Sequence, residues 1–532
     1  MAESRVQAAN PYKPMRAPRG PQLSCKGWQQ EAALRLLMNS VDPAVAEHPE
    51  ELIVSSGIGK LARDWQAFHA IAKSLQAIED DETLVIHDGE SGPILETNLD
   101  VPRVLVVNSA FPPPARNEGS PASERAAPKQ AARMAARMAA DWMFTGPASE
   151  LPEAYEILRA AAHEHFGGSL RGRLVVAAGM GGMGGALALA ATLNSGAFLG
   201  IDADAARIKR YVKTGYCEVM VNNLDEALRI LKNAVRKRAP ASVGLISNPA
   251  ELIPALAHRG VLPDLLTALT FADETYLPPS LTVAQALEWS DKDPRAYVKA
   301  CLDSIAANAG AMAELKKAGA VILFELGNEI RARAFAPGVA DAYESAVFTS
   351  EFVPDSAPSR VLLTIVALSG DAGDLARIDD LFPSLFPDSE LPLWVAIARR
   401  HPSPGLPARS CWMGGDDASK LGVAINDLVA AGAIKTPVAM GRSIRQSRAR
   451  NLLGSYHPLA QAANSGTAGE ALADSPELRA LLNAGKGASW LSVHASGGAD
   501  EGGERSAAFV VADGSPKTSE RIERLFAKDF AS

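Results

Sequence analysis

Residues 174–201 form a run of 28 residues without a charged side chain, which is long enough to cross a bilayer as a helix. Seven of these residues are glycine, and five of the seven lie in the sequence GMGGMGG. Such a cluster would break a lone helix, but it suits a strand that enters a tight turn and a new helix. We therefore interpret the run as two buried strands flanking a turn and its helix, rather than as a membrane span.

Composition narrows the class of protein. With 532 residues, 47% of them hydrophobic and 21% charged, the chain is expected to fold into two to four domains. The 53 basic and 61 acidic residues give a net charge of −8, which argues against nucleic acid or an anionic membrane as the main partner. The first twenty residues lack the apolar core of a secretory signal, and the four cysteines are far apart, so we expect a reduced, cytoplasmic protein without a metal site.

The order of predicted elements indicates an α/β fold. From about residue 155, helices and strands alternate as far as a strand near residues 320–326, which predicts a doubly wound parallel sheet. Mixed segments precede and follow this part. In the N-terminal segment, helices are expected at 25–48 and 60–77, and strands at 51–60, 84–92 and 102–110. Residues 111–131 are rich in proline, serine and charge, which predicts a long loop or a lid.

The glycine-rich turn is the first candidate site. Residues 179–184 fit the pattern G-x-G-x-x-G, follow a predicted strand and open a predicted helix. Without Cβ atoms, backbone amides and the positive helix N-terminus approach a diphosphate closely. Asp202 ends the next strand 18 positions after Gly184, where a ribose-binding carboxylate is expected. The pattern favours a dinucleotide site; the alternative is a turn that is merely packed closely against its neighbours.

Longer segments resemble one known family. They are WQQEAALRLLMNSVDPAVAEHPEELIVSSGIGKLARDW, GMGGMGGALALAATL, ARIKRYVKTGY, ALSGDAGDLARID, GLPARSCWMGGDDASKLGVAINDL and LLNAGKGASWLSVH, and together they resemble the urocanase (urocanate hydratase) family. The resemblance implies a cytosolic homodimer in which a Rossmann-type NAD-binding domain is inserted into a mixed α/β core built from both chain ends. The corresponding boundaries are 1–138 and 348–532 for the core and 139–347 for the insert.

The resemblance also implies a chemistry. A family member adds water to an imidazole acrylate and produces an imidazolone propionate, with tightly bound NAD+ acting as an electrophile rather than as a hydride carrier. An imidazole carbon of the substrate adds to the nicotinamide, which makes the conjugated side chain open to water. The cationic pyridinium supplies the electron sink that the substrate lacks.

Site residues are carried over by matching motifs. The positions implied to contact NAD are Ser56, Gly57, Gly182, Met183, Gly184, Gly185, Asp202, Arg207, Asn248, Pro249, Thr270, Tyr276, Leu277 and Gly497. Cys411 matches the family's active-site cysteine, and Arg377 keeps a basic position of the SGD motif, so both are catalytic candidates. The alternatives are a buried small hydrophobe for Cys411 and a solvated surface residue for Arg377.

Departures from the family pattern cluster where the substrate ring is recognised. Met138 stands where the family has a threonine, Leu326 replaces the tyrosine of DYGNN, and Phe271 lies in a shortened segment. These changes remove hydrogen-bonding groups, and each orphaned partner on a bare imidazole would cost about 1–3 kcal/mol. We therefore expect a ring with a soft sulfur substituent at C2, namely thiourocanate or S-methyl thiourocanate, as in ergothioneine breakdown.

Other interpretations stay open at this point. Ordinary urocanate is the alternative substrate. An NAD-dependent dehydrogenase and a catalytically silent NAD-binding protein are the alternative classes, since a fold by itself does not separate them. The substrate carboxylate needs a cation, and the candidates are four arginines in one stretch: Arg442, Arg445, Arg448 and Arg450. Arg450 is the one we assign to the substrate.

Overall fold

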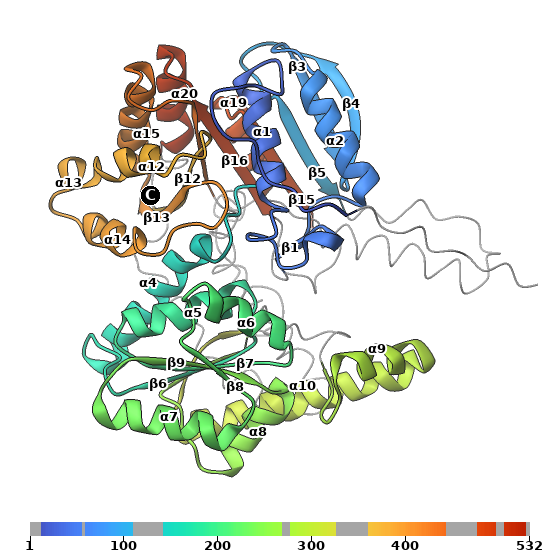
Figure 1. The fold of residues 1–532 in the computed structure, drawn as a ribbon, viewed down its shortest axis with the longest axis vertical. Helices are drawn as coiled ribbons and strands as arrows, with labels where there is room; N and C mark the ends of the chain where they lie inside the picture. The colour runs from blue at the N-terminus through green and yellow to red at the C-terminus, as the bar shows by residue number, and fades with distance from the viewer. Residues whose placement is uncertain are drawn as a thin grey trace, which may run out of the picture.

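The computed structural model describes residues 12–55, 59–109, 142–268, 277–325, 360–442, 476–495 and 505–527. These residues form two large sheets, each with helices packed on it, and one small two-stranded sheet (Figure 1). One large sheet has six strands from the middle of the chain, and the other has eight strands from both chain ends. The fold is therefore α/β, with the middle of the chain inserted into a core that the two ends build together.

The six-stranded sheet is entirely parallel, with the strand order β11-β10-β6-β7-β9-β8. Its elements in chain order are α4 (Pro147–Phe166), β6 (Leu174–Ala178), α5 (Gly182–Leu193), β7 (Ala197–Asp202), α6 (Ala205–Lys213), β8 (Val219–Val221), α7 (Leu224–Lys237), β9 (Ala241–Ile246), α8 (Pro249–His258), β10 (Leu265–Ala268), α9 (Val283–Lys292), α10 (Pro294–Lys317) and β11 (Val321–Glu325).

Helices cover both faces of this sheet. Along β6, Val175 and Ala177 pack into a cluster with residues of α4 and α5, whereas Leu174 and Val176 pack into a cluster with residues of α7, α8 and α10. Successive strand residues point to opposite faces, so a strand covered on both faces is apolar throughout. The uncharged run at 174–201 is thus strand, turn, helix and strand, as the sequence predicts.

The eight-stranded sheet joins the two chain ends, in the order β13-β12-β14-β16-β15-β5-β3-β4. The N-terminal elements of this part are α1 (Trp28–Asn39), a 3-10 turn (Pro49–Glu51), β1 (Ile53–Ser55) and β2 (Gly59–Lys60), which pair with each other in a separate sheet, α2 (Trp65–Ala77), β3 (Glu82–His87), β4 (Glu90–Glu96) and β5 (Val104–Ser109). Its C-terminal elements are β12 (Arg360–Ala367), α12 (Ala372–Asp379), α13 (Phe382–Leu385), α14 (Leu391–Ala398), β13 (Ala408–Gly414), α15 (Gly415–Ala430), β14 (Val438–Arg442), α19 (Pro476–Gly485), β15 (Trp490–Ala495), β16 (Arg505–Ala512) and α20 (Pro516–Phe526).

The join between the ends is the pairing of β5 with β15. These strands run parallel, with Val104 opposite Trp490 and Asn108 opposite His494. Trp490 is fully buried, stacked on Phe509 of the neighbouring strand at a centroid distance of 5.3 Å. A core that needs strands from both termini confirms the expected insertion.

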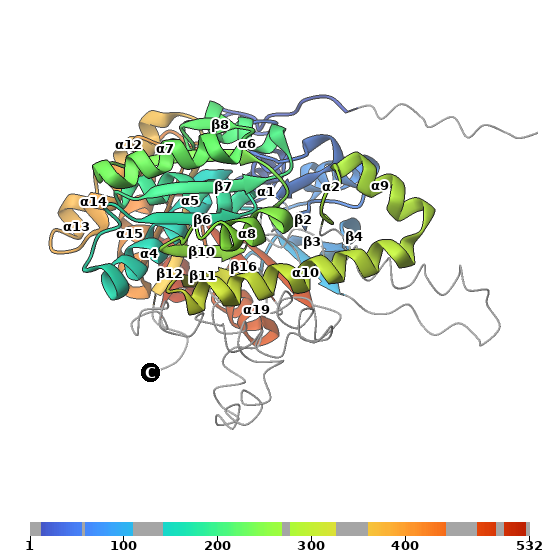
Figure 2. The same cartoon turned by 90° about the horizontal axis from the view of Figure 1, so that it is seen from below.

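Some local expectations were wrong. The helix expected at 25–48 ends at Asn39, because Pro43 disfavours helical geometry in the residue before it and lacks an amide hydrogen. The strand expected at 84–92 is a hairpin of β3 and β4, whose turn residues Asp88 and Gly89 both have positive φ. The helices α9 and α10 were not predicted; α10 packs beside α8 on the sheet, and α9 lies at the outer end of α10 (Figure 2).

Two further expectations concerned a lid and a membrane span. The possible lid at 111–131 lies outside the described residues. Among the residues that are described, no helix combines the length and the apolar character that crossing a membrane requires.

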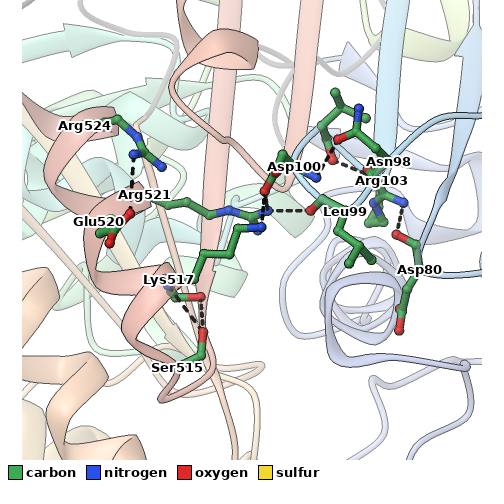
Figure 3. A network of polar contacts seen from close by, with 12 residues as sticks. Asp80, Asn98, Leu99, Asp100, Arg103, Ser515, Lys517, Glu520, Arg521 and Arg524 are labelled. Carbon is green, nitrogen blue, oxygen red and sulfur yellow. Dashed lines mark hydrogen bonds and ion pairs between the residues drawn. The ribbon is translucent and has the colours of Figure 1, made fainter.

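A polar network also ties the two ends together (Figure 3). Asp100, just before β5, forms ion pairs with Lys517 and Arg521 of α20, and Arg521 also donates to the carbonyl of Leu99. The neighbouring Arg103 is buried and donates to four backbone carbonyls, including those of Glu82 and Val101 at 2.8 Å each. The network holds the loop before β5 against the C-terminal helix.

Asp100→Asn is expected to lower the unfolding temperature slightly at pH 7. Hydrogen bonds from Lys517 and Arg521 lower the pKa of Asp100 from 3.8, so its contribution is present above that value and is lost as the pH falls through the lower folded pKa. Because the carboxylate is exposed, salt at about 1 M should also shrink the difference. Thermal scans across pH and salt measure both. A difference between wild type and variant that persists in acid would contradict this account.

Candidate functional site

The strand order places a candidate site at one edge of the parallel sheet. β6 pairs with β7 on one side and with β10 on the other, so the chain reverses its direction of winding between β6 and β10. In open α/β sheets, ligands bind beyond the carboxyl ends of the strands at such a reversal. The turn that follows β6, Asp202 at the end of β7 and Asn248 after β9 all lie at this edge.

The glycine turn has the backbone that a diphosphate requires. Gly179 has φ of +102°, which a side chain rarely permits. Gly181 caps α5 without a side-chain hydrogen bond, so no side chain of its own covers the helix N-terminus. The first amides of a helix have no partner within it, and they favour an anion.

A tyrosine of the next helix holds the turn from behind. The hydroxyl of Tyr211 on α6 donates to the carbonyl of Gly181 at 3.0 Å. A Cβ on Gly185 would lie 2.0–2.4 Å from the ring atoms of Tyr211, so the ring packs directly on the α5 backbone. Gly185 is therefore required for close packing, and its place in the motif does not depend on touching a ligand.

Asp202 is engaged by the protein itself. Its Oδ2 accepts from the amide of Met180 at 2.8 Å and from Arg207 at 3.0 Å, and its Oδ1 accepts from the amide of Asp204 at 2.9 Å and from Arg207 at 3.2 Å. A carboxylate has about four acceptor positions. Asp202 thus fixes the glycine turn to the end of β7, and ribose hydroxyls would have to share these positions or displace Arg207.

The surroundings of Arg207 are strongly acidic. Burial lowers the pKa of its guanidinium, but the carboxylates of Asp202 and Glu47 outweigh burial, so the pKa lies above the ordinary value. Burial, followed by the charge of Glu47, likewise raises the pKa of Tyr211 above its usual range. Arg207 therefore stays charged and forms a fixed pair with Asp202 beside the turn.

Asn248, Pro249 and Leu277 come together as one unit. Asn248 caps α8 by accepting from the amide of Ala250 at 2.9 Å, and Pro249 is the first residue of that helix. The Asn248 amide donates to the carbonyls of Leu277 and Pro278 at 3.1 and 2.8 Å. Asn248 therefore anchors the chain where it returns from the segment after β10.

The N-terminal core also reaches the turn. An ideal Cβ on Gly182 would lie 3.1 Å from Oγ of Ser55, at the end of β1, and 3.1 Å from Oε1 of Glu150 on α4. Arg210 of α6 donates to the carbonyls of Ala44, Val45 and Ala46. The sequence reasoning missed Glu150 and Arg210, because tertiary packing and no local motif brings them here: α4 packs on α5, and α6 packs on the N-terminal core.

The two catalytic candidates lie in the core. Cys411 on β13 is fully buried, within 3.9 Å of the Met413 sulfur and in the same apolar cluster as Leu363 and residues of α4. Arg377 on α12 is about half exposed and pairs with the buried Asp374 at 3.2 Å. A catalytic role for either residue stays a proposal.

The remaining candidates fall outside the described residues. They are Ser56, Gly57, Met138, Thr270, Phe271, Tyr276, Leu326, Arg445, Arg448, Arg450 and Gly497. Within the described ranges, no group of three or more histidine, cysteine, aspartate or glutamate side chains could hold a metal ion.

Family models match nearly the whole chain. The urocanase N-terminal domain matches residues 15–130, the urocanase Rossmann-like domain matches 151–354, and the urocanase C-terminal domain matches 360–532. The chain belongs to the urocanase family. Membership supports a hydro-lyase that acts on urocanate-like small molecules, and the Rossmann-like domain fits nucleotide binding. The boundaries expected at 138 and 347 remain predictions.

Proposed function

We propose that the protein adds water to a C2-sulfur-substituted imidazole acrylate, with NAD+ held at the glycine turn. The observation that supports the cofactor is the turn itself: a glycine-rich connection at the reversal point of a parallel sheet, which leads into a helix whose N-cap residue is a glycine. Support for the sulfur substituent comes from Met138, Phe271 and Leu326, which make the expected ring-recognition positions less polar.

Different residues would contact different parts of NAD+. The amides at the start of α5 would bind the diphosphate, and Asp202 and Arg207 flank the expected ribose position. Asn248 and Leu277 would border the cofactor on the far side of β7. When bound, the oxidised nicotinamide supplies a cationic electron sink beside the substrate ring.

The chain's own residues have three tasks in this proposal. The turn and Tyr211 position the cofactor, because they fix the α5 N-terminus in one geometry. Arg450 clamps the substrate carboxylate, since a guanidinium binds a carboxylate with two parallel hydrogen bonds. Cys411 and Arg377 are the proposed catalytic residues. We further propose that the protein is cytoplasmic and forms a homodimer. Light scattering of the purified protein would test the oligomeric state.

A substrate comparison tests the reaction. Purified protein is incubated separately with urocanate, thiourocanate and S-methyl thiourocanate while the ultraviolet band of each acrylate is followed. We expect the fastest loss with a sulfur compound, a product about 18 Da heavier than its substrate, and no net NADH. Faster turnover of urocanate than of both sulfur compounds would favour ordinary urocanate hydration. Stoichiometric NADH absorbance would favour a dehydrogenase, and no turnover would favour a silent NAD-binding protein.

A further inference from the structure

Helix α6 of the inserted domain carries side chains that face in two directions. Arg207 pairs with Asp202 at an N to O distance of 3.0 Å, beside the expected ribose position. The hydroxyl of Tyr211 donates to the carbonyl of Gly181 at 3.0 Å, in the glycine turn. Arg210 lies between these two residues in the sequence, but its guanidinium reaches the N-terminal core. Figure 1 shows α6 on the side of the inserted domain nearest to β1.

Arg210 binds a turn of the core, residues 42–46, through three successive backbone carbonyls. It donates to the carbonyl of Ala46 at 2.7 Å, to that of Ala44 at 3.1 Å and to that of Val45. Val45 and Ala46 are 0% and 1% exposed, so water does not replace these hydrogen bonds when they break. Because a guanidinium presents its donors in a fixed plane, the contact sets both the distance and the angle between α6 and the core turn.

The core turn leads directly into β1, which returns to the glycine turn. Backbone hydrogen bonds of 3.0–3.1 Å join residues 47–48 to residues 53–54. β1 ends at Ser55, whose Oγ lies 3.1 Å from the position that a Cβ on Gly182 would take. The contacts therefore form a closed ring, which runs from the glycine turn through α6 and the core turn to β1 and back to the glycine turn.

A second contact connects the end of α6 with the strand that carries Cys411. Tyr216, which follows α6, is 5% exposed, and its ring packs edge-on against His401 with a centroid distance of 6.2 Å. The loop after His401 leads into β13. A Cβ on Gly405 in this loop would lie 2.7 Å from Cγ2 of Val45, so the loop also packs on the core turn. Helix α6 thus contacts the segments that precede both β1 and β13.

We propose that α6 aligns the inserted domain with the core for catalysis, and that Arg210 is its main positioning residue. The inference rests on the proposed function in so far as NAD+ occupies the glycine turn. The inserted domain then holds the cofactor, while Cys411 and Arg377 belong to the core, so the reaction depends on how the two parts are placed. A displacement of about 1 Å between reacting groups lowers a rate about a hundredfold. Arg210 touches neither cofactor nor substrate in this scheme, so its loss affects the rate more than cofactor retention.

The test compares Arg210→Met with Lys209→Met, which removes an exposed cation from the neighbouring position of the same helix. Arg210→Lys is the second variant, because an ammonium keeps donors for the carbonyls but lacks the planar geometry. It decides the question by the same measurements if Arg210→Met does not fold. The measurements are kcat and KM with the best of the three acrylates, the NAD+ content after loading with excess NAD+, and hydrogen exchange of peptides covering 42–55 and 179–186 with and without NAD+.

For Arg210→Met we expect kcat to fall by about 10- to 100-fold, with KM and NAD+ content within about twofold of wild type. NAD+ should slow hydrogen exchange at 179–186 in every protein. At 42–55 it should do so in wild type and Lys209→Met but not in Arg210→Met, and Arg210→Lys should be intermediate in both kcat and exchange. A wild-type kcat in Arg210→Met, or loss of its NAD+, would overturn the proposal.

Hydrogen exchange separates this proposal from the proposed function. If wild type binds NAD+ but turns over none of the acrylates, the proposed reaction is wrong, and slowing at 42–55 that depends on Arg210 still supports the alignment by α6. If NAD+ slows exchange of wild type at 179–186 alone, the alignment by α6 is wrong and the proposed function stands. If NAD+ slows neither segment, both are wrong.

Discussion

Arg35→Met is expected to destabilise the fold by about 3–5 kcal/mol, the largest effect of any single substitution considered. Arg35 and Glu31 form an ion pair on α1 with an Nε to Oε1 distance of 2.8 Å, and both side chains are fully buried. Removing the cation leaves a buried carboxylate whose remaining donors are the amides of Ser24 and Cys25, at 2.7 and 2.9 Å. A lone buried charge is far more costly than a buried pair.

The same guanidinium also connects the two chain ends. It donates to the carbonyls of Gly20 at 2.9 Å and Gln22 at 2.6 Å in the N-terminal segment, and to that of Leu368 at 2.6 Å, just after β12. Methionine replaces none of these bonds. The loss therefore affects the join between the ends, and the whole core should unfold at a lower urea concentration.

Urea denaturation followed by circular dichroism measures the effect, with two comparisons. The double variant Glu31→Gln/Arg35→Met removes both charges, so it should be less destabilised than Arg35→Met alone. Lys299→Met breaks an exposed pair of the same i,i+4 spacing with Asp303 and should cost less than about 0.5 kcal/mol. If Arg35→Met and Lys299→Met unfold at similar urea concentrations, the buried pair of Glu31 and Arg35 does not stabilise the contact between the chain ends.

The parallel sheet was predictable because its strands and turns are marked by residues that lie next to one another in the sequence. Each strand of the run at 174–201 is buried on both faces and hence apolar throughout, and the turn is marked by its glycines. The β3 to β4 hairpin carried a comparable signal in Asp88 and Gly89, a dipeptide typical of two-residue turns. It was missed because the residues on either side were interpreted as one strand.

The site was only partly predictable, because much of it is made by contacts between distant segments. The motif identified Asp202, yet nothing in the motif shows that Arg207 and the amide of Met180 already occupy the carboxylate. Ser55 approaches the turn from the N-terminal core, and Glu150 approaches it from α4, which packs on α5. Contacts of that kind join segments that lie far apart in the sequence, and local periodicity does not encode them.

Gly185→Ala is expected to abolish cofactor retention and to destabilise the protein by about 1–3 kcal/mol, the cost typical of overpacking. The new methyl group would lie 2.0 Å from Cζ of the Tyr211 ring, well inside van der Waals contact, and the ring is only 2% exposed and has little room to retreat. Moving the ring breaks its hydrogen bond to the carbonyl of Gly181. The turn then loses the contact that fixes it from behind, and its amides no longer converge on a diphosphate.

Gly310→Ala is the matched control, because Gly310 lies inside α10 with nothing within 4 Å of the position of a Cβ. There alanine should stabilise the protein by about 0.5–1 kcal/mol, since glycine is the poorer helix former. Thermal unfolding and the NAD+ content of each purified variant, compared after loading with excess NAD+, measure both effects. If Gly185→Ala keeps the unfolding temperature and NAD+ content of wild type, the contact between α5 and Tyr211 does not determine the geometry of the turn. Close packing on Tyr211 would then not be the reason for a glycine at this position.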